Sequence, residues 1–243
     1  MGFTFRKCLK THSGFITSLI ILSKTELVSG SLDYIIKIWD LGTLNCVKTI
    51  RVLSDKIFVK LSKKLILCSS FNDYSIKIIK LSNEEISQNF KGYNGSVTSI
   101  AKLSKTLIAS GGYDASIKIR DIETEECLKT LDLTDIIRII VKLNKYQIVS
   151  GSYCLIKIWD FEMGQCTKTL NGHTEDVLYI VKLSKTKLLS GSEDCSIKIW
   201  DSLTGTCLTN LKTTSSVTYL VKINKTQIVS GSEVASIKLW DLF

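Results

Sequence analysis

Nearly identical twelve-residue segments return along this chain at even intervals. SGSLDYIIKIWD at Ser29–Asp40 comes back as SGSEDCSIKIWD at Ser190–Asp201, and looser copies begin at Ser69, Ser110, Ser150 and Ser230. The residues in the tryptophan position of the six copies are 39 to 41 positions apart, namely Trp39, Ile79, Arg120, Trp159, Trp200 and Trp240. A fixed period of this size indicates repeated supersecondary units that bury their apolar faces against one another. The chain is therefore predicted to be an array of six equivalent units.

Each period is filled by four short stretches rich in Val, Ile, Leu and Thr, separated by Gly, Ser, Asn and Asp. In the fifth copy the stretches are VLYIVKL, KLLSGS, SIKIWD and CLTNL. Short stretches of this kind without helical spacing are typical of β-strands, and the residues between them are typical of turns. The sequence therefore predicts an all-β chain.

The period of about forty residues and the IWD endings resemble the WD-repeat β-propeller family, whose four-stranded antiparallel blades surround a central channel. The resemblance covers essentially the whole chain, and the Trp-Asp pair stands in four of the six copies. It implies a closed six-bladed propeller. The last copy ends after its third strand, whereas RKCLKT near the N-terminus matches the fourth-strand pieces NCVKT and ECLKT. We therefore expect the N-terminal strand to pair into the last blade and close the ring.

Composition favours a single domain over residues 1–243. Apolar residues make up 44% of the chain, charged residues 23%, and there is no proline and no low-complexity linker. The longest apolar stretches are too short to span a bilayer, and the N-terminus lacks the apolar run of a signal peptide. We expect a protein that does not span a membrane.

The cysteines indicate the compartment. Five of the eight fall on one fourth-strand position, which is filled by Cys8, Cys46, Cys127, Cys166 and Cys207. We interpret them as small core hydrophobes, because no C-x-x-C motif or Cys/His cluster accompanies them. Unpaired thiols fit a reducing compartment, so we expect a cytoplasmic protein.

The resemblance also implies a buried hydrogen-bond chain in each complete blade, which joins a His, a Ser, an Asp and the Trp. Two sets with identical spacing fit this pattern, namely His12, Ser29, Asp33 and Trp39, and His173, Ser190, Asp194 and Trp200. A Ser, a His and an Asp together could also suggest a hydrolase. However, a hydroxyl that is bonded to an indole inside a blade is withheld from any substrate. We interpret both sets as structural.

No catalytic, cofactor or metal site is predicted. The six segments expected to line the channel contain no Asp, Glu or His, so they supply no general acid, base or metal ligand. The glycines stand in turns between strands and form no phosphate-binding loop.

The leading hypothesis, which rests on the resemblance, is a non-catalytic scaffold that binds a protein or peptide partner on the rim of the channel. The slots that point to this rim differ from blade to blade and include apolar and aromatic residues, which are typical of interaction sites. The candidate residues are Phe15, Leu32, Lys56, Tyr113, Ile136, Arg138, Tyr153, Asp176, Leu178, Glu193 and Glu233. The acidic residues among them would favour basic ligands on one side. We expect a monomeric propeller that works within a larger complex.

The net charge of +9 leaves a second hypothesis open. Seventeen lysines repeat in three slots: Lys37, Lys77, Lys118, Lys157, Lys198 and Lys238; Lys24, Lys63, Lys105, Lys145, Lys185 and Lys225; and Lys60, Lys102, Lys142, Lys182 and Lys222. Such rings could bind nucleic acid, anionic lipid or phosphate. Duplication of one lysine-bearing repeat explains them equally well, and we favour that explanation because no Arg or aromatic residues interleave as base-stacking sites require.

Overall fold

A computed structural model describes residues 12–52, 58–70, 72–224, 226–234 and 236–242. Every regular element among these residues is a β-strand, which confirms the all-β prediction. The chain divides into two compact units, residues 1–97 and residues 98–243. The single domain over residues 1–243 stays a prediction.

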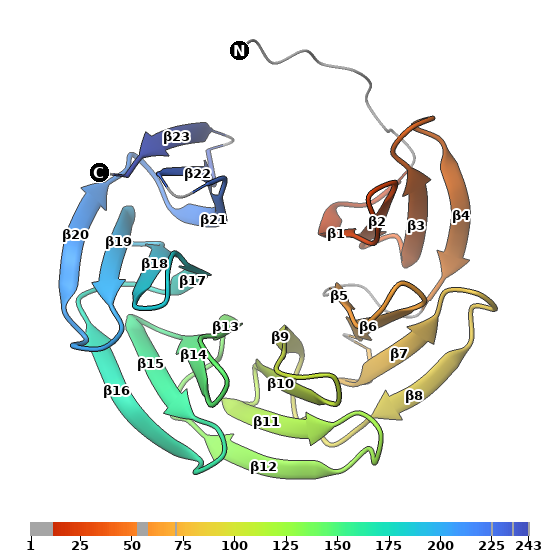
Figure 1. The fold of residues 1–243 in the computed structure, drawn as a ribbon, viewed down its shortest axis with the longest axis horizontal. Helices are drawn as coiled ribbons and strands as arrows, with labels where there is room; N and C mark the ends of the chain where they lie inside the picture. The colour runs from red at the N-terminus through yellow and green to blue at the C-terminus, as the bar shows by residue number, and fades with distance from the viewer. Residues whose placement is uncertain (1–11, 53–57, 71, 225, 235, 243) are drawn as a thin grey trace. The chain divides into compact units, whose positions relative to one another are not determined.

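The first unit contains two four-stranded antiparallel sheets, each a simple meander in chain order (Figure 1). Blade 1 consists of β1 (Ile16–Ile21), β2 (Glu26–Ser31), β3 (Ile35–Asp40) and β4 (Cys46–Arg51). Blade 2 consists of β5 (Phe58–Lys60), β6 (Leu65–Ser69), β7 (Ile76–Lys80) and β8 (Ile86–Phe90).

The second unit contains the remaining four sheets, of which β9 begins one residue before the unit boundary. Blade 3 consists of β9 (Val97–Lys102), β10 (Leu107–Gly112), β11 (Ser116–Asp121) and β12 (Cys127–Asp132). Blade 4 consists of β13 (Ile139–Lys142), β14 (Gln147–Gly151), β15 (Leu155–Asp160) and β16 (Gln165–Asn171). Blade 5 consists of β17 (Val177–Lys182), β18 (Lys187–Ser192), β19 (Ser196–Asp201) and β20 (Cys207–Lys212). Blade 6 consists of β21 (Val217–Lys222), β22 (Gln227–Ser232) and β23 (Ile237–Asp241).

The blades confirm the predicted fold class, an all-β propeller of antiparallel blades. Within the second unit the first strands of successive blades, β13, β17 and β21, lie beside one another (Figure 1). Five sheets have four strands, and blade 6 has three among the described residues. The N-terminal strand expected to complete blade 6 belongs to residues 1–11, outside the described residues, so ring closure stays a prediction.

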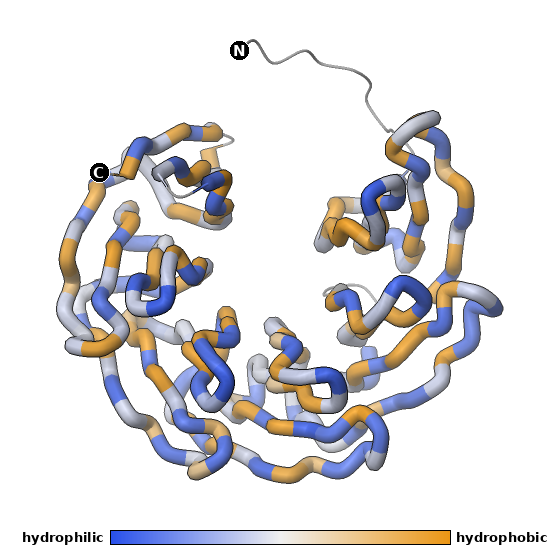
Figure 2. The backbone as a smooth tube through the Cα atoms, in the orientation of Figure 1, coloured by the Kyte–Doolittle hydropathy of each residue, from blue (hydrophilic) through white to orange (hydrophobic). Residues whose placement is uncertain are grey.

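The apolar pattern of the strands explains how the blades pack. Hydrophobic residues recur along the strands (Figure 2), and blade 4 has apolar residues on both faces, because its Ile148 and Trp159 share a buried cluster with Ile117 of blade 3. The core therefore lies between successive blades. For example, Ile156 and Leu170 of blade 4 share one buried cluster with Val177, Ile180 and Trp200 of blade 5.

Each residue of the Trp-Asp pair stands at a defined point of its blade. The pairing of the third and fourth strands shifts by one residue at the tryptophan slot in all five four-stranded blades, as at Ile38/Trp39 and Ile199/Trp200, because the fourth strand carries one extra residue there. The following aspartate caps the next turn, because Asp40 Oδ1 accepts hydrogen bonds from the backbone N–H groups of Thr43, at 2.6 Å, and Gly42, at 3.0 Å. These bonds, that of Thr43 first, lower the pKa of Asp40.

The prediction that the fourth-strand cysteines are core hydrophobes was wrong for those that the structure describes. Cys127, Cys166 and Cys207 are exposed and Cys46 is partly exposed, whereas Cys8 lies outside the described residues. The fourth strand is the outermost of each blade, so this slot faces solvent. Each of the four thiols donates to the backbone carbonyl two residues further along its strand, as Cys207 does to Thr209 at 3.4 Å.

Candidate functional site

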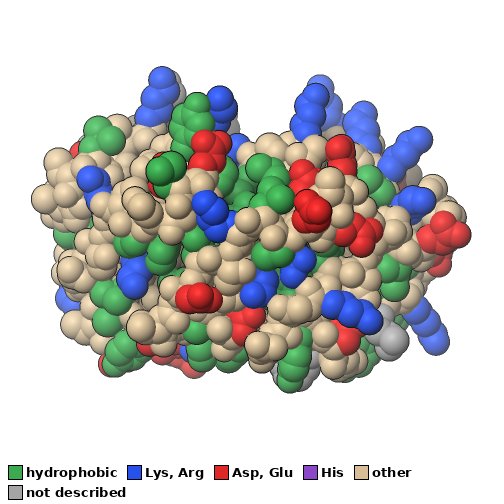
Figure 3. All heavy atoms as spheres, turned by 90° about the horizontal axis from the view of Figure 1, so that it is seen from below, with side chains coloured by type: hydrophobic (Ala, Val, Ile, Leu, Met, Phe, Trp, Pro, Cys, Tyr) green, Lys and Arg blue, Asp and Glu red, His purple; other side chains and the backbone are tan. Residues whose placement is uncertain are grey.

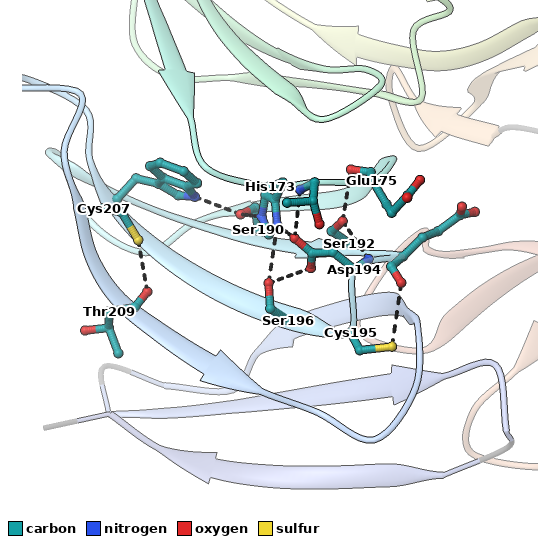
Figure 4. A network of polar contacts seen from close by, with 12 residues as sticks. His173, Glu175, Ser190, Ser192, Asp194, Cys195, Ser196, Cys207 and Thr209 are labelled. Atoms are coloured by element: carbon teal, nitrogen blue, oxygen red, sulfur yellow. Dashed lines mark hydrogen bonds and ion pairs between the residues drawn. The ribbon is translucent and has the colours of Figure 1, made fainter.

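The polar residues of blade 5 form one continuous hydrogen-bond chain (Figure 4). Trp200 Nε1 donates to Ser190 Oγ at 2.7 Å, and Ser190 Oγ lies 2.6 Å from His173 Nε2. His173 Nδ1 lies 2.7 Å from Asp194 Oδ2. An indole N–H can only donate, so the Ser190 hydroxyl accepts its hydrogen bond and donates its own O–H to His173 Nε2. The imidazole hydrogen is then on Nδ1, which donates to the Asp194 carboxylate. Each donor in this hydrogen-bond network therefore has an acceptor.

The charge state of this chain follows from its surroundings. Burial lowers the pKa of His173, although the hydrogen bond to Asp194 opposes the shift. For Asp194, burial acts to raise the pKa, but hydrogen bonds from Ser196 and His173 outweigh it and the pKa is lowered. Ser196 Oγ donates to Asp194 Oδ1 at 2.5 Å. The chain therefore holds a neutral imidazole against an ionised carboxylate.

Blade 1 repeats the arrangement in the first unit. Trp39 Nε1 donates to Ser29 Oγ at 2.8 Å, His12 Nε2 lies 2.7 Å from the same oxygen, and His12 Nδ1 lies 2.9 Å from Asp33 Oδ2. The structure thus brings together all four predicted residues in both sets. In each set the hydroxyl is buried and already bonded on both sides, so its role is to tie the loop before the first strand to the second and third strands of the blade.

Blades 4 and 6 keep only one part of this chain. Trp159 donates to Ser150 at 2.9 Å and Trp240 donates to Ser230 at 2.8 Å. Neither blade has a histidine, since both histidines of the chain belong to blades 1 and 5. The indole-to-hydroxyl bond is therefore the minimal form of the network.

Three of the candidate rim residues, all in the second unit, form a connected cluster. Arg138 lies in the loop before β13, Asp176 in the loop before β17, and Tyr113 in the turn between β10 and β11. The Arg138 guanidinium contacts Asp176 Oδ2 through Nη2 at 2.6 Å and through Nε at 2.8 Å. Nη1 lies 3.4 Å from the Tyr113 hydroxyl, and the guanidinium carbon is 5.8 Å from the centre of the Tyr113 ring. One arginine therefore links blades 3, 4 and 5.

The backbone explains why residues so far apart in sequence meet. The segments that lead into blades 4 and 5 each bond to the end of the second strand, or the turn after it, in the blade before. Ile137 N donates to Gly112 O at 3.1 Å, and Val177 N donates to Ser152 O at 3.1 Å. These two bonds carry Arg138 to Tyr113 and bring the loop of Asp176 beside the turn of blade 4.

The ion pair changes the charge expected for this surface. Partial burial acts to lower the pKa of Arg138, but the hydrogen bond and charge of Asp176 outweigh it and raise the pKa. The pairing engages Oδ2 of Asp176, and the expectation that the acidic rim residues favour basic ligands on one side stays a prediction. Glu193 and Glu233 are the exposed acids of this set in the second unit.

The exposure of the apolar and aromatic rim candidates differs between the two units. In the second unit, Tyr113 and Tyr153 are 46% and 53% exposed, and Ile136 and Leu178 are partly exposed. In the first unit, Phe15 is 82% exposed and Leu32 is 40% exposed, and Leu32 N donates to Phe15 O at 3.0 Å. Lys56 lies outside the described residues.

Most repeated lysines have structural partners or partial burial, which the sequence did not indicate. In the third-strand slot, Lys77 and Lys198 are buried, and none of the others is exposed. In the first-strand slot, the ammonium groups of Lys142, Lys182 and Lys222 donate to backbone carbonyls of the preceding blade. In the turn slot Lys24, Lys63, Lys105, Lys145 and Lys185 are exposed, whereas Lys225 lies outside the described residues. Figure 3 shows basic side chains standing out along the upper edge of that view.

Two other kinds of site are absent from the described residues. Within the described ranges, no three His, Cys, Asp or Glu side chains are grouped closely enough to hold a metal ion. No helix in the part of the chain that the structure describes has the length and apolar character needed to cross a membrane.

Comparison with known proteins agrees with the blades. The WD40 family model (WD domain, G-beta repeat) matches residues 3–40, 84–121 and 164–201. The chain is 28% identical over 250 residues to nuclear distribution protein PAC1 of Arthroderma otae, an alignment that covers 85% of this chain and 54% of the relative. It is 22% identical over 219 residues to the DENN domain and WD repeat-containing protein SCD1 of Arabidopsis thaliana, covering 83% of this chain and 18% of the relative.

A third relative is the small ribosomal subunit protein RACK1y of Oryza sativa subsp. japonica, which is 28% identical over 138 residues, or 53% of this chain and 41% of the relative. The chain thus spans about half the length, or less, of these relatives. The repeats, the blades that they form and these matches show that the chain belongs to the WD-repeat family.

Proposed function

We propose that this chain is a non-catalytic scaffold that binds a protein or peptide partner through the tyrosine–arginine surface of its second unit. This surface comprises Tyr113, Ile136, Arg138, Tyr153 and Leu178. Family membership supports the general role, and the name of the rice relative describes a component of a larger assembly. The free thiols of Cys127, Cys166 and Cys207 support a reducing compartment such as the cytoplasm.

The observation that carries the proposal is the way Arg138 is held. Two bonds to Asp176 and one to Tyr113 fix its guanidinium, while the Tyr113 ring remains 46% exposed. Tyr and Arg are the residue types that most often anchor protein interfaces. A side chain that is already held in place loses less conformational freedom when a partner binds. Tyr113 and Arg138 therefore form a preorganised anchor.

The test is affinity capture from an extract of the source cell with the full chain as bait. A Tyr113→Ala/Tyr153→Ala variant should lose a partner that the unchanged chain retains, because it removes both exposed rings. Tyr146→Ala is the matched control, since Tyr146 is 45% exposed but lies in the turn between β13 and β14, at the opposite end of blade 4 from Tyr153. Melting temperatures of all variants should stay close to that of the unchanged chain.

Two results would contradict the proposal. The double tyrosine variant could capture the same proteins as the unchanged chain. Alternatively, the chain could bind heparin and RNA, with binding lost at moderate salt, and capture no protein partner, which would favour the alternative of a polyanion ligand.

A further inference from the structure

The first unit carries a basic hollow between the first hairpin turns of its two blades. Its volume is about 810 Å³, and its wall includes Lys24 of the β1–β2 turn with Lys60 and Lys63 of blade 2. One carboxylate, that of Glu26, lines the same hollow, and its Oε2 accepts a hydrogen bond from Ser23 Oγ at 3.1 Å. Three ammonium groups against one carboxylate leave the hollow positively charged.

Lys60 is seated differently from its counterparts in the second unit. Its ammonium lies 3.4 Å from the carbonyl of Ile21, a long hydrogen bond. In the other blades with a described bond at this slot, the lysine bonds to the carbonyl of the leucine that ends the first strand region, as Lys182 does to Leu143. The corresponding residue in blade 1 is Leu22, one position after Ile21. Lys24 and Lys63 are exposed. The charge of the hollow is therefore accessible to a ligand.

An apolar groove of about 320 Å³ adjoins the hollow and shares Leu22, Glu26 and Lys63 with it. Ile38, Val47 and Leu81 supply the rest of its apolar wall. Such a groove between blades can accept one aliphatic side chain, and Val47 is 58% exposed.

The lysines around the groove differ in availability. Lys48 is already engaged, because its ammonium donates to the carbonyls of Leu81, at 2.7 Å, and Ser82, at 3.0 Å, and lies 3.4 Å from a carboxylate oxygen of Glu84. Lys63 and Lys64, which also line the groove, are exposed, and Lys63 lines the hollow as well. The groove therefore has an apolar wall with free positive charge on the side nearest the hollow.

We propose that the hollow and groove of the first unit together form a docking site for an acidic peptide segment that carries one aliphatic side chain. Its carboxylates would lie over Lys24, Lys60 and Lys63, and its aliphatic side chain would enter the groove beside Leu22. The argument is charge complementarity together with the adjoining apolar wall. Among the described residues that line the two walls there is no arginine and no aromatic ring on which nucleic-acid bases could stack. This site is separate from the tyrosine–arginine surface, and neither proposal depends on the other.

The second unit contains a natural comparison. A groove of about 360 Å³ between blades 5 and 6 is lined by Leu183, Ile199, Leu208 and Leu242, each 161 positions after its counterpart in the first unit. Lys187 stands there in place of Glu26, and Thr209 in place of Lys48. The apolar wall is thus repeated while the polar groups around it are not.

The test uses a fluorescein-labelled peptide, Glu-Glu-Asp-Leu-Asp-Glu-Glu, and the full chain, with binding followed by fluorescence anisotropy. A Lys24→Glu/Lys63→Glu variant should weaken binding by about tenfold or more, because two attractive contacts become repulsive. The matched control, Lys105→Glu/Lys145→Glu, makes the same change in the same slot of the second unit and should alter binding less than about twofold. Replacing the peptide leucine by serine should weaken binding by about tenfold, the effect of removing one buried aliphatic side chain.

Several outcomes would overturn the proposal. Equal losses for the two double variants would mean that the peptide responds only to overall charge. An unchanged affinity for the serine peptide would mean that the groove is not occupied. Binding to phosphatidylserine vesicles or to RNA without binding to the peptide would show a different class of ligand. Thermal unfolding of each variant verifies that the fold is retained.

Discussion

Removing one hydroxyl should cost blade 5 about twice as much as it costs blade 4. Ser190 is bonded to both Trp200 and His173, whereas among the described residues the Ser150 side chain bonds only with Trp159. The two serines occupy the same slot, are 0% and 1% exposed, and belong to the same unit. The substitutions Ser190→Ala and Ser150→Ala are therefore matched in everything except the number of partners left without a bond.

The expected magnitude follows from that number. A buried polar group left without a hydrogen bond costs about 1–3 kcal/mol of the free energy of unfolding. Ser150→Ala leaves the Trp159 indole, which is 6% exposed, without its hydrogen bond, so this substitution should cost that amount for one group. Ser190→Ala leaves both the Trp200 indole and His173 Nε2 and should cost about 2–6 kcal/mol. At about 2–4 °C of melting temperature per kcal/mol for a chain of this size, the difference is readily measured.

Urea unfolding followed by tryptophan fluorescence measures both costs, and a double-mutant cycle locates their origin. In a chain that already carries His173→Ala, the further change Ser190→Ala should cost about 1–3 kcal/mol, because only the indole remains to lose its bond. Equal costs for Ser190→Ala and Ser150→Ala in the unchanged chain would refute the reasoning. So would a cost for Ser190→Ala that does not depend on His173.

Three further predictions follow from single features. Because burial lowers the pKa of His173 below its ordinary value of 6.5, the unfolded chain gains a proton that the folded chain does not when the pH falls below that value. Stability measured by urea unfolding should therefore fall between pH 6.5 and 5.5 by up to about 1 kcal/mol, and a His173→Gln variant that keeps the same slope would contradict this. Gly191→Ala should cost about 1–3 kcal/mol by overpacking, since its Cβ would lie 2.5 Å from Val217 Cγ1, whereas Gly231→Ala in the same slot of blade 6, with its nearest contact at 3.4 Å, should cost far less in the same assay. Equal losses of unfolding free energy for the two glycine variants would contradict this prediction. Deletion of residues 1–10 should expose the edge of blade 6 and cause aggregation or domain swapping, seen by light scattering, and a soluble, monomeric and equally stable truncation would refute ring closure.

The sequence was most informative where the fold requires the same residue in every repeat. The strands, the turns and the slots of Trp39 and Trp200 repeat because each blade is built from the same antiparallel order of strands. The resemblance to the WD-repeat family, applied to residues at matching spacing, was sufficient to predict that His173, Ser190 and Asp194 lie together, because their contacts stay within one blade and its own preceding loop.

The sequence was least informative about contacts between different blades. Tyr113, Arg138 and Asp176 occupy three different slots in three successive repeats, so no periodicity marks them as neighbours. The exposure of Cys127 has a similar origin, because its slot looks like a buried strand position until the fourth strand is known to lie outermost. Variation among blades indicated where a partner could bind, but the ion pair that arranges the surface depends on how loops of adjacent blades meet.

Charge shows the same distinction between repeated slots and local surroundings. The net charge of +9 suggests a broadly basic ligand surface, yet Lys142, Lys182 and Lys222 bond to carbonyls of the preceding blade, and a third-strand lysine such as Lys198 is buried. A lysine that bonds a neighbouring carbonyl stabilises the stacking of blades and contributes less to attracting a ligand. The turn lysines therefore carry most of the free charge among the described repeated lysines. What distinguishes Lys24 in the first unit is the combination of a hollow beside it and an apolar groove beyond, so the selectivity of that surface depends on its shape as much as on its charge.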